Sequence, residues 1–140
     1  MTVIVHDEGF ASETWEHGFA SVDERAANDT RGLDLPSDTD PGELGKLMLG
    51  VDAIRIDFPS FADGRGFSLA RQLRNLGFQG LLRAAGHVIS DQYAMARRSG
   101  FDEVEISDEL AARQPEEEWV YRADWKAYDY RSRLMGAAQA

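Results

Sequence analysis

The sequence predicts an α/β protein with a small, mostly parallel sheet, an irregular N-terminal region and an aromatic C-terminal tail. The first observation is a pattern that occurs three times, in which a glycine and an apolar residue precede a short alternating run. The second is the helical spacing of apolar residues before these glycines. The third is the shortness of the links, which favours consecutive αβ units with right-handed crossovers.

The three copies of the pattern lie at residues 50–56, 77–83 and 100–106. Each opening glycine suits the left-handed conformation just past the end of a helix, and its apolar neighbour can fold back onto the last helical turn. The run that follows is typical of a strand. In the last run Glu103 and Glu105 alternate with Val104 and Ile106, which predicts a strand at the edge of the sheet.

A helix is expected before each of these strands. The first begins at Asp40 and Pro41, which suit the N-cap and the first helical position. The third begins near Ser90. The second is defined by apolar residues at helical spacing, which are Phe67, Leu69, Ala70, Leu73 and Leu76.

We interpret the 140 residues as a single domain. Residues 1–40 form an irregular region with a short strand at residues 3–5, and residues 41–107 form an αβαβαβ core. Residues 108–140 form a C-terminal helix, which begins near Pro115, and a tail. The aromatic residues of this part pack on the sheet or on a partner; they are Trp119, Tyr121, Trp125, Tyr128 and Tyr130.

Composition excludes several kinds of site. The chain has no cysteine, which removes disulfides, thiol nucleophiles and cysteine-bound zinc or iron–sulfur clusters. Its three histidines do not have the spacing of a metal motif, so we expect no metal. A net charge of −10 disfavours nucleic acid and anionic membranes as partners. No membrane-length apolar run and no secretion signal is present, which predicts a cytoplasmic protein.

The middle of the chain is basic although the whole is acidic. Residues 50–101 contain seven bases, all arginine, and four acids. The planar guanidinium suits phosphate, sulfate and carboxylate ligands. The other interpretation is that these arginines lie on solvated helix faces. They are Arg55, Arg65, Arg71, Arg74, Arg83, Arg97 and Arg98.

Ligands of parallel α/β proteins bind at the carboxyl ends of the strands. Two polar, glycine-containing loops occupy this place, at residues 57–68 and 83–92. Backbone N–H groups at a helix start attract anions, and a nearby arginine adds to the attraction. We therefore expect a ligand- or anion-binding site, whose residues are Asp63, Gly64, Arg65, Gly66, Arg83 and Gln92.

Three residues of these loops are candidates for acid–base catalysis, namely Asp63, His87 and Asp91. A purely structural interpretation stays open for each of them. Asp63 caps a helix or pairs with Arg65, Asp91 favours the first turn of a helix, and His87 is an ordinary loop residue. The glycines at 64 and 66 do not form a dinucleotide fingerprint and no Walker lysine is present, so no cofactor is evident.

A specific set of spaced residues runs through the same region. It comprises Phe58, Pro59, Phe61, Asp63, Gly64, Arg65, Gly66, Ser68, Ala70, Leu73, Arg74, Gly80, Arg83, Ala84, Gly86, Val88, Asp91, Gln92, Arg98, Gly100, Phe101 and Asp102. On these residues the chain resembles an uncharacterised bacterial family, a domain of unknown function. Members of that family are typically encoded beside assimilatory sulfite reductase and other cysteine-biosynthesis genes.

The resemblance implies a role in reducing sulfite or sulfate to sulfide for cysteine synthesis. Members of the family are commonly labelled probable oxidoreductases, but a redox enzyme needs a carrier and this sequence has no motif for one. We therefore expect an accessory or binding protein, which binds an oxyanion such as sulfite or docks on sulfite reductase or its electron donor. The alternative is a small oxidoreductase or other enzyme that acts on a sulfur-pathway metabolite. We also expect a homodimer, formed through the edge strand or the tail.

Overall fold

The computed structural model describes residues 2–24 and 31–125. At its centre is one six-stranded sheet with the strand order β2-β1-β6-β5-β4-β3. Neighbouring strands from β3 to β6 pair in parallel, whereas β1 is antiparallel to both β2 and β6. The predicted α/β class with a mostly parallel sheet is confirmed. The strands are β1 (Thr2–His6), β2 (Gly9–Ala11), β3 (Gly32–Leu35), β4 (Ala53–Phe58), β5 (Leu81–Gly86) and β6 (Glu103–Ser107).

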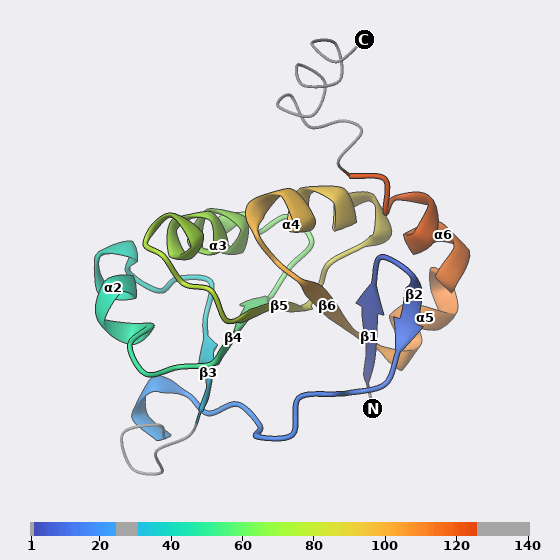
Figure 1. Cartoon of the computed structure of the whole chain (residues 1–140). Coiled ribbons are helices and arrows are strands. Elements are labelled where there is room, and N and C mark those ends of the chain that lie inside the picture. Colours follow the sequence, from blue (N-terminus) through green and yellow to red (C-terminus); the bar gives the residue numbers. More distant parts are fainter. Residues whose placement is uncertain (1, 25–30, 126–140) are drawn as a thin grey trace, which may run out of the picture.

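Helices connect the parallel strands and cover one face of the sheet. Strands β3 to β6 lie side by side in chain order, so each right-handed crossover steps in the same direction and places its helix on the same face. Figure 1 shows α2, α3 and α4 together on that face. The helices are η1 (Pro41–Glu43), α2 (Leu44–Leu47), α3 (Arg65–Asn75), η2 (Ser90–Gln92), α4 (Tyr93–Ser99), α5 (Asp108–Arg113) and α6 (Glu116–Tyr121).

The three repeated glycines follow their helices as predicted. Their φ angles are all positive, at 73° for Gly50, 99° for Gly77 and 114° for Gly100. Beyond Gly100, the backbone N–H of Phe101 donates to the carbonyl of Ala96 at 3.1 Å, which turns the chain back onto α4. This turn delivers the chain directly into β6.

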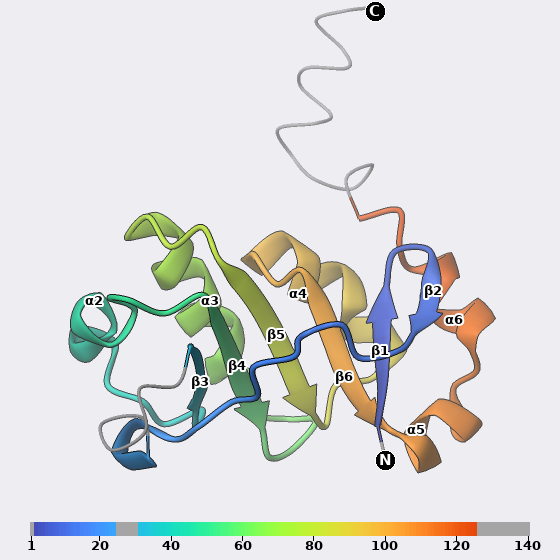
Figure 2. The ribbon, with the colours of Figure 1, turned by 60° about the horizontal axis from the view of Figure 1, so that its bottom comes forward.

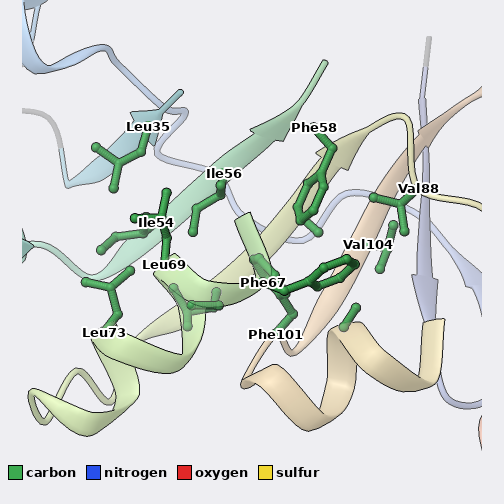
Figure 3. Packing of buried hydrophobic residues seen from close by; sticks show 14 of the residues in the cluster. Leu35, Ile54, Ile56, Phe58, Phe67, Leu69, Leu73, Val88, Phe101 and Val104 are labelled. Atoms are coloured by element: carbon green, nitrogen blue, oxygen red, sulfur yellow. The ribbon is translucent and has the colours of Figure 1, made fainter. Parts of the chain in front are cut away.

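The hydrophobic core lies between the sheet and the helices (Figure 3). Because side chains alternate along a strand, β4 directs Ile54, Ile56 and Phe58 to the helix face, where each is at most 1% exposed. The ring of Phe58 packs on Phe67 of α3 with their centroids 4.9 Å apart. This packing fixes the start of α3 against the carboxyl end of β4.

Helices α2, α3 and α4 do not cover the opposite face of the sheet, which residues 12–24 cross instead (Figure 2). Strand β6 lies between β1 and β5, so the prediction of an edge position for it was wrong. Its acidic residues alternate with apolar ones because Val104 and Ile106 enter the core while Glu103 and Glu105 face the second side. The alternation therefore arises because one face of β6 is apolar and the other is charged, and it does not indicate a sheet edge.

Both edges of the sheet are partly occupied. At β2, the carboxylate of Glu116 accepts a hydrogen bond from the backbone N–H of Phe10 at 2.8 Å. At β3, the backbone of Ala20 donates to Gly32 at 3.0 Å and accepts from Asp34 at 2.8 Å. Few backbone N–H and C=O groups of the edge strands are therefore free to pair with another sheet edge. The homodimer stays a prediction.

Two of the described C-terminal aromatic residues, Trp119 and Trp125, pack on the chain itself, whereas Tyr121 is exposed. Trp119 is fully buried and donates from its indole N–H to the carbonyl of Gln114 at 2.9 Å. The indole N–H of Trp125 donates to Asp7 at 3.2 Å. Two further aromatic residues of the predicted tail, at positions 128 and 130, lie outside the described residues. In residues 2–24 and 31–125 no helix has the length and apolarity needed to span a bilayer.

Candidate functional site

The predicted anion loop forms a closed set of contacts at the start of α3. The carboxylate of Asp63 accepts from Arg65 Nη2 at 2.8 Å, from Arg65 Nε at 3.0 Å and from the Arg65 backbone N–H at 3.1 Å. The hydroxyl of Ser37 also donates to Asp63, at 2.8 Å. Hydrogen bonds from Arg65, and then from Ser37, hold the pKa of Asp63 well below its usual value. The charge of Arg65 is thus matched within its own loop.

The two glycines of this loop have different roles. A Cβ on Gly66 would lie 2.5 Å from the buried ring of Phe58, so only glycine fits where α3 meets β4. A Cβ on Gly64 would meet nothing closer than Phe67, at 3.9 Å. Gly66 therefore serves close helix–strand packing, which needs no ligand.

Arg83 does not lie with Arg65. Its side chain is fully buried on the face of the sheet opposite α3 and α4. It contacts the carboxylates of Glu13 at 2.6 Å, Glu103 at 2.8 Å and Glu105 at 2.9 Å. Burial opposes the charge of Arg83, but hydrogen bonds to Glu13 and Glu103 outweigh this effect and raise its pKa.

Arg83 belongs to a row of charges that crosses the sheet, which we call the charged face. Arg55 of β4 donates to both carboxylate oxygens of Asp34, at 2.6 and 2.8 Å, and to Glu105 at 3.2 Å. The residues of the charged face are His6, Glu13, Asp34, Arg55, Arg83, Glu103 and Glu105.

Sequence reasoning missed the charged face, although a signal for it exists. Charged residues stand at alternate positions of neighbouring strands, as in Arg55 and Asp57 of β4 and in Glu103 and Glu105 of β6. Side chains at alternate positions share one face. Glu13 comes from an irregular segment and has no such signal.

The remaining predicted residues lie in the loop after β5. His87 is exposed, with Nδ1 3.2 Å from the carbonyl oxygen of Phe58 and its ring edge-on to Phe61. Gln92 donates to the carbonyl of Phe61 at 2.9 Å, so it ties the two predicted loops together. Asp91 pairs with Arg122 at 2.9 Å and lines a separate shallow hollow beside α6.

A pocket of about 670 Å³ opens on the charged face at the carboxyl ends of β3 to β6. Among the residues predicted for the site, His87 lines this pocket and the others do not. The small side chain of Ala85 lies between Asp57 of β4 and Glu105 of β6 in the strand register. The lining residues are Thr2, Ser21, Asp34, Leu35, Pro36, Arg55, Asp57, Phe61, Ala85, Gly86, His87, Glu105, Ile106, Ser107, Glu109, Leu110 and Arg113.

The pocket combines matched and unmatched charges. Arg55, Asp34 and Glu105 neutralise one another in part, as described above. Asp57, Glu109 and Arg113 have no side-chain hydrogen bond or ion pair with any residue that the structure describes, and all three are exposed. These groups are therefore available to a ligand. Within the same described ranges, no group of three or more histidine or acidic side chains is arranged to hold a metal ion.

A family model described as "Bacterial protein of unknown function (DUF934)" matches residues 32–132. The chain belongs to this family. The matched segment begins at β3 and includes both predicted loops and most of the pocket, whereas β1, β2 and Glu13 precede it. No curated protein and no solved structure matches the chain.

Several residues that carry the family resemblance hold the scaffold together. Arg74 of α3 donates to the carbonyls of Gly80 at 2.9 Å and Gly100 at 3.0 Å, and it pairs with Asp102 at 2.9 Å. Asp102 in turn accepts from the backbone N–H of Leu82 at 2.9 Å. This part of the shared pattern fixes α3 against the starts of β5 and β6, away from the pocket.

Proposed function

We propose that the protein is a cytoplasmic accessory or binding protein of assimilatory sulfite and sulfate reduction and cysteine biosynthesis, and that its ligand site is the pocket on the charged face. The resemblance to the bacterial family supports the pathway. One observation supports the binding role, namely a pocket of about 670 Å³ at the carboxyl ends of four parallel strands. Parallel α/β proteins bind ligands at this end of the sheet.

The loop of Asp63 and Arg65 is a less favourable place for an oxyanion. Asp63 already engages the guanidinium of Arg65 through two nitrogen atoms. An oxyanion would have to displace this carboxylate or approach beside it, and Asp38 adds a further negative charge nearby. Sulfite binding at this loop stays a prediction. The variant Arg65→Ala tests it, because the affinity of the protein for sulfite should fall only if the loop is the binding site.

The alternative function is a small enzyme, and one observation favours it. His87 and Asp57 line the same pocket, so a base and an acid face the same space. Against it, Asp63 and Asp91 are engaged in ion pairs with Arg65 and Arg122. An oxidoreductase would in addition need an electron carrier. Turnover of sulfite by the purified protein with an added electron donor, abolished by His87→Ala, would establish the alternative.

The partner of an accessory protein here is sulfite reductase or its electron donor. The outer face of α6 suits such a contact, because Tyr121 is 78% exposed and Val120 is 41% exposed beside acidic side chains. Deleting the chain from Pro115 onward would remove buried Trp119 and damage the fold. The paired change Glu117→Lys and Glu118→Lys keeps Trp119 and tests the contact cleanly.

The decisive test of the pathway is growth of a strain that lacks the gene. We expect normal growth on sulfide or cysteine and slow growth on sulfate or sulfite. The wild-type gene should restore growth, and Ala85→Leu, which fills the pocket floor, should not. Normal growth of the deletion strain on sulfate as the sole sulfur source would overturn the proposal.

A further inference from the structure

The shape of the pocket is set by a small residue in the middle of the charged face. Alternate residues of β5 that face this side are Arg83, Ala85 and, just beyond the strand, His87. Ala85 and His87 line the pocket, whereas Arg83 does not, and the short side chain of Ala85 leaves the pocket open at this position. Asp57 and Glu105 flank this position on the neighbouring strands. A ligand seated over Ala85 therefore meets carboxylates on both sides.

The available charges within the pocket are mostly negative. Glu105 already accepts hydrogen bonds from Arg55 and Arg83. Asp57, Glu109 and Arg113 have no partner among the described residues, which leaves two carboxylates and one guanidinium for a ligand. Sulfite or sulfate would meet a net repulsion here, whereas a ligand with its own ammonium group would be attracted.

The rest of the lining is apolar. Leu35, Pro36, Phe61, Ile106 and Leu110 contribute to the walls. A carbon side chain can be buried there, while the polar groups of the lining fix its orientation. The pocket thus offers places for an ammonium group, a carboxylate and an apolar body.

We propose that the ligand of this pocket is a free amino acid, bound as its zwitterion with the ammonium group at Asp57 and the carboxylate at Arg113. This proposal rests on the proposed function, because it names the ligand class of the same pocket. The positively charged ammonium group distinguishes this ligand from the oxyanion expected from the sequence. Arginine is suited to bind a carboxylate in its planar fork, and Asp57 supplies an acceptor for the ammonium group.

The test is a thermal-shift panel on the full chain at fixed ionic strength. The probes are the twenty common L-amino acids, sulfite, sulfate and phosphate, followed by the N-acetyl and amide forms of any amino acid that raises the Tm in a saturable way. The variants are Asp57→Asn, Arg113→Gln and Ala85→Leu. Glu8→Gln is the matched control, since Glu8 is an exposed acid outside the pocket lining.

We expect at least one amino acid to raise the Tm, with its affinity reduced about tenfold or more by Asp57→Asn and by Arg113→Gln, a loss of one charged contact each. Ala85→Leu should abolish binding and Glu8→Gln should leave it unchanged. Both capped forms should fail to bind. If an inorganic anion binds and only Ala85→Leu removes it, the pocket stands and the amino-acid proposal is overturned. If no probe shifts the Tm, both the pocket and its ligand class are overturned.

Discussion

Replacing Arg83 by methionine should be among the most destabilising single changes in this protein. The guanidinium is 0% exposed and lies between three carboxylates, of which Glu103 is 3% exposed and Glu13 is 47% exposed. After the change, Glu13 can turn to solvent and Glu105 keeps its bonds to Arg55. Glu103 keeps only His6, with Nε2 at 2.6 Å. Leaving a buried charge without its partner costs about 3–5 kcal/mol.

Urea denaturation followed by tryptophan fluorescence measures this loss. With an m-value of about 2 kcal/mol/M, the midpoint should fall by about 2 M. Arg71→Met is the matched control: Arg71 is exposed, its side chain makes no hydrogen bond or ion pair with the residues described, and the change should alter stability by less than about 0.5 kcal/mol. The double variant Arg83→Met with Glu103→Leu should recover part of the loss, because the uncompensated carboxylate is gone. A midpoint for Arg83→Met equal to that of Arg71→Met would refute the reasoning.

Three further predictions follow from the same contacts. Gly66→Ala should destabilise the fold by about 1–3 kcal/mol through overpacking against Phe58, whereas Gly64→Ala should be tolerated; equal midpoints in urea would contradict this. Because the folded pKa of Asp63 lies below its usual value of 3.8, its contribution to stability is complete above about pH 4 and is lost as the pH falls further. Asp63→Asn should therefore be less stable than the wild type at pH 7, with a difference that narrows in acid; a difference independent of pH would contradict the assignment. Trp119→Ala should lower the free energy of unfolding by about 3–5 kcal/mol because the indole is fully buried, whereas Tyr121→Ala should be nearly neutral; calorimetric Tm values of the two variants check this.

The sequence was sufficient to predict the αβ units, because their signals are local. Gly50, Gly77 and Gly100 each end a helix and precede a strand, and this pattern depends only on neighbouring residues. The order of the strands depends on distant pairing, and there the prediction for β6 was wrong. Strand β1 at residues 2–5 pairs with β6 at residues 104–107, and the alternation in β6 does not encode so distant a pairing.

The candidate site was predictable only in part. The rule that ligands bind at strand carboxyl ends placed the predicted site at the same end of the sheet as the pocket, and His87 lines that pocket. The rule does not say on which face the pocket opens. Arg83 and Arg65 come from neighbouring segments, yet alternation along β5 turns Arg83 to the charged face, where Glu13 from a distant segment neutralises it.

The most direct test of the central claim, that the ligand site is the pocket on the charged face, is an NMR titration of the ¹⁵N-labelled protein. The ligand is the amino acid that gives the largest thermal shift, and sulfite, which the pocket should repel, is the comparison. The account predicts that the amide signals of Ala85, Gly86, His87 and Ser107 move in a saturable way, while those of residues 63–66 move little. Shifts centred on residues 63–66 would contradict the account and would restore the loop at the start of α3 as the site.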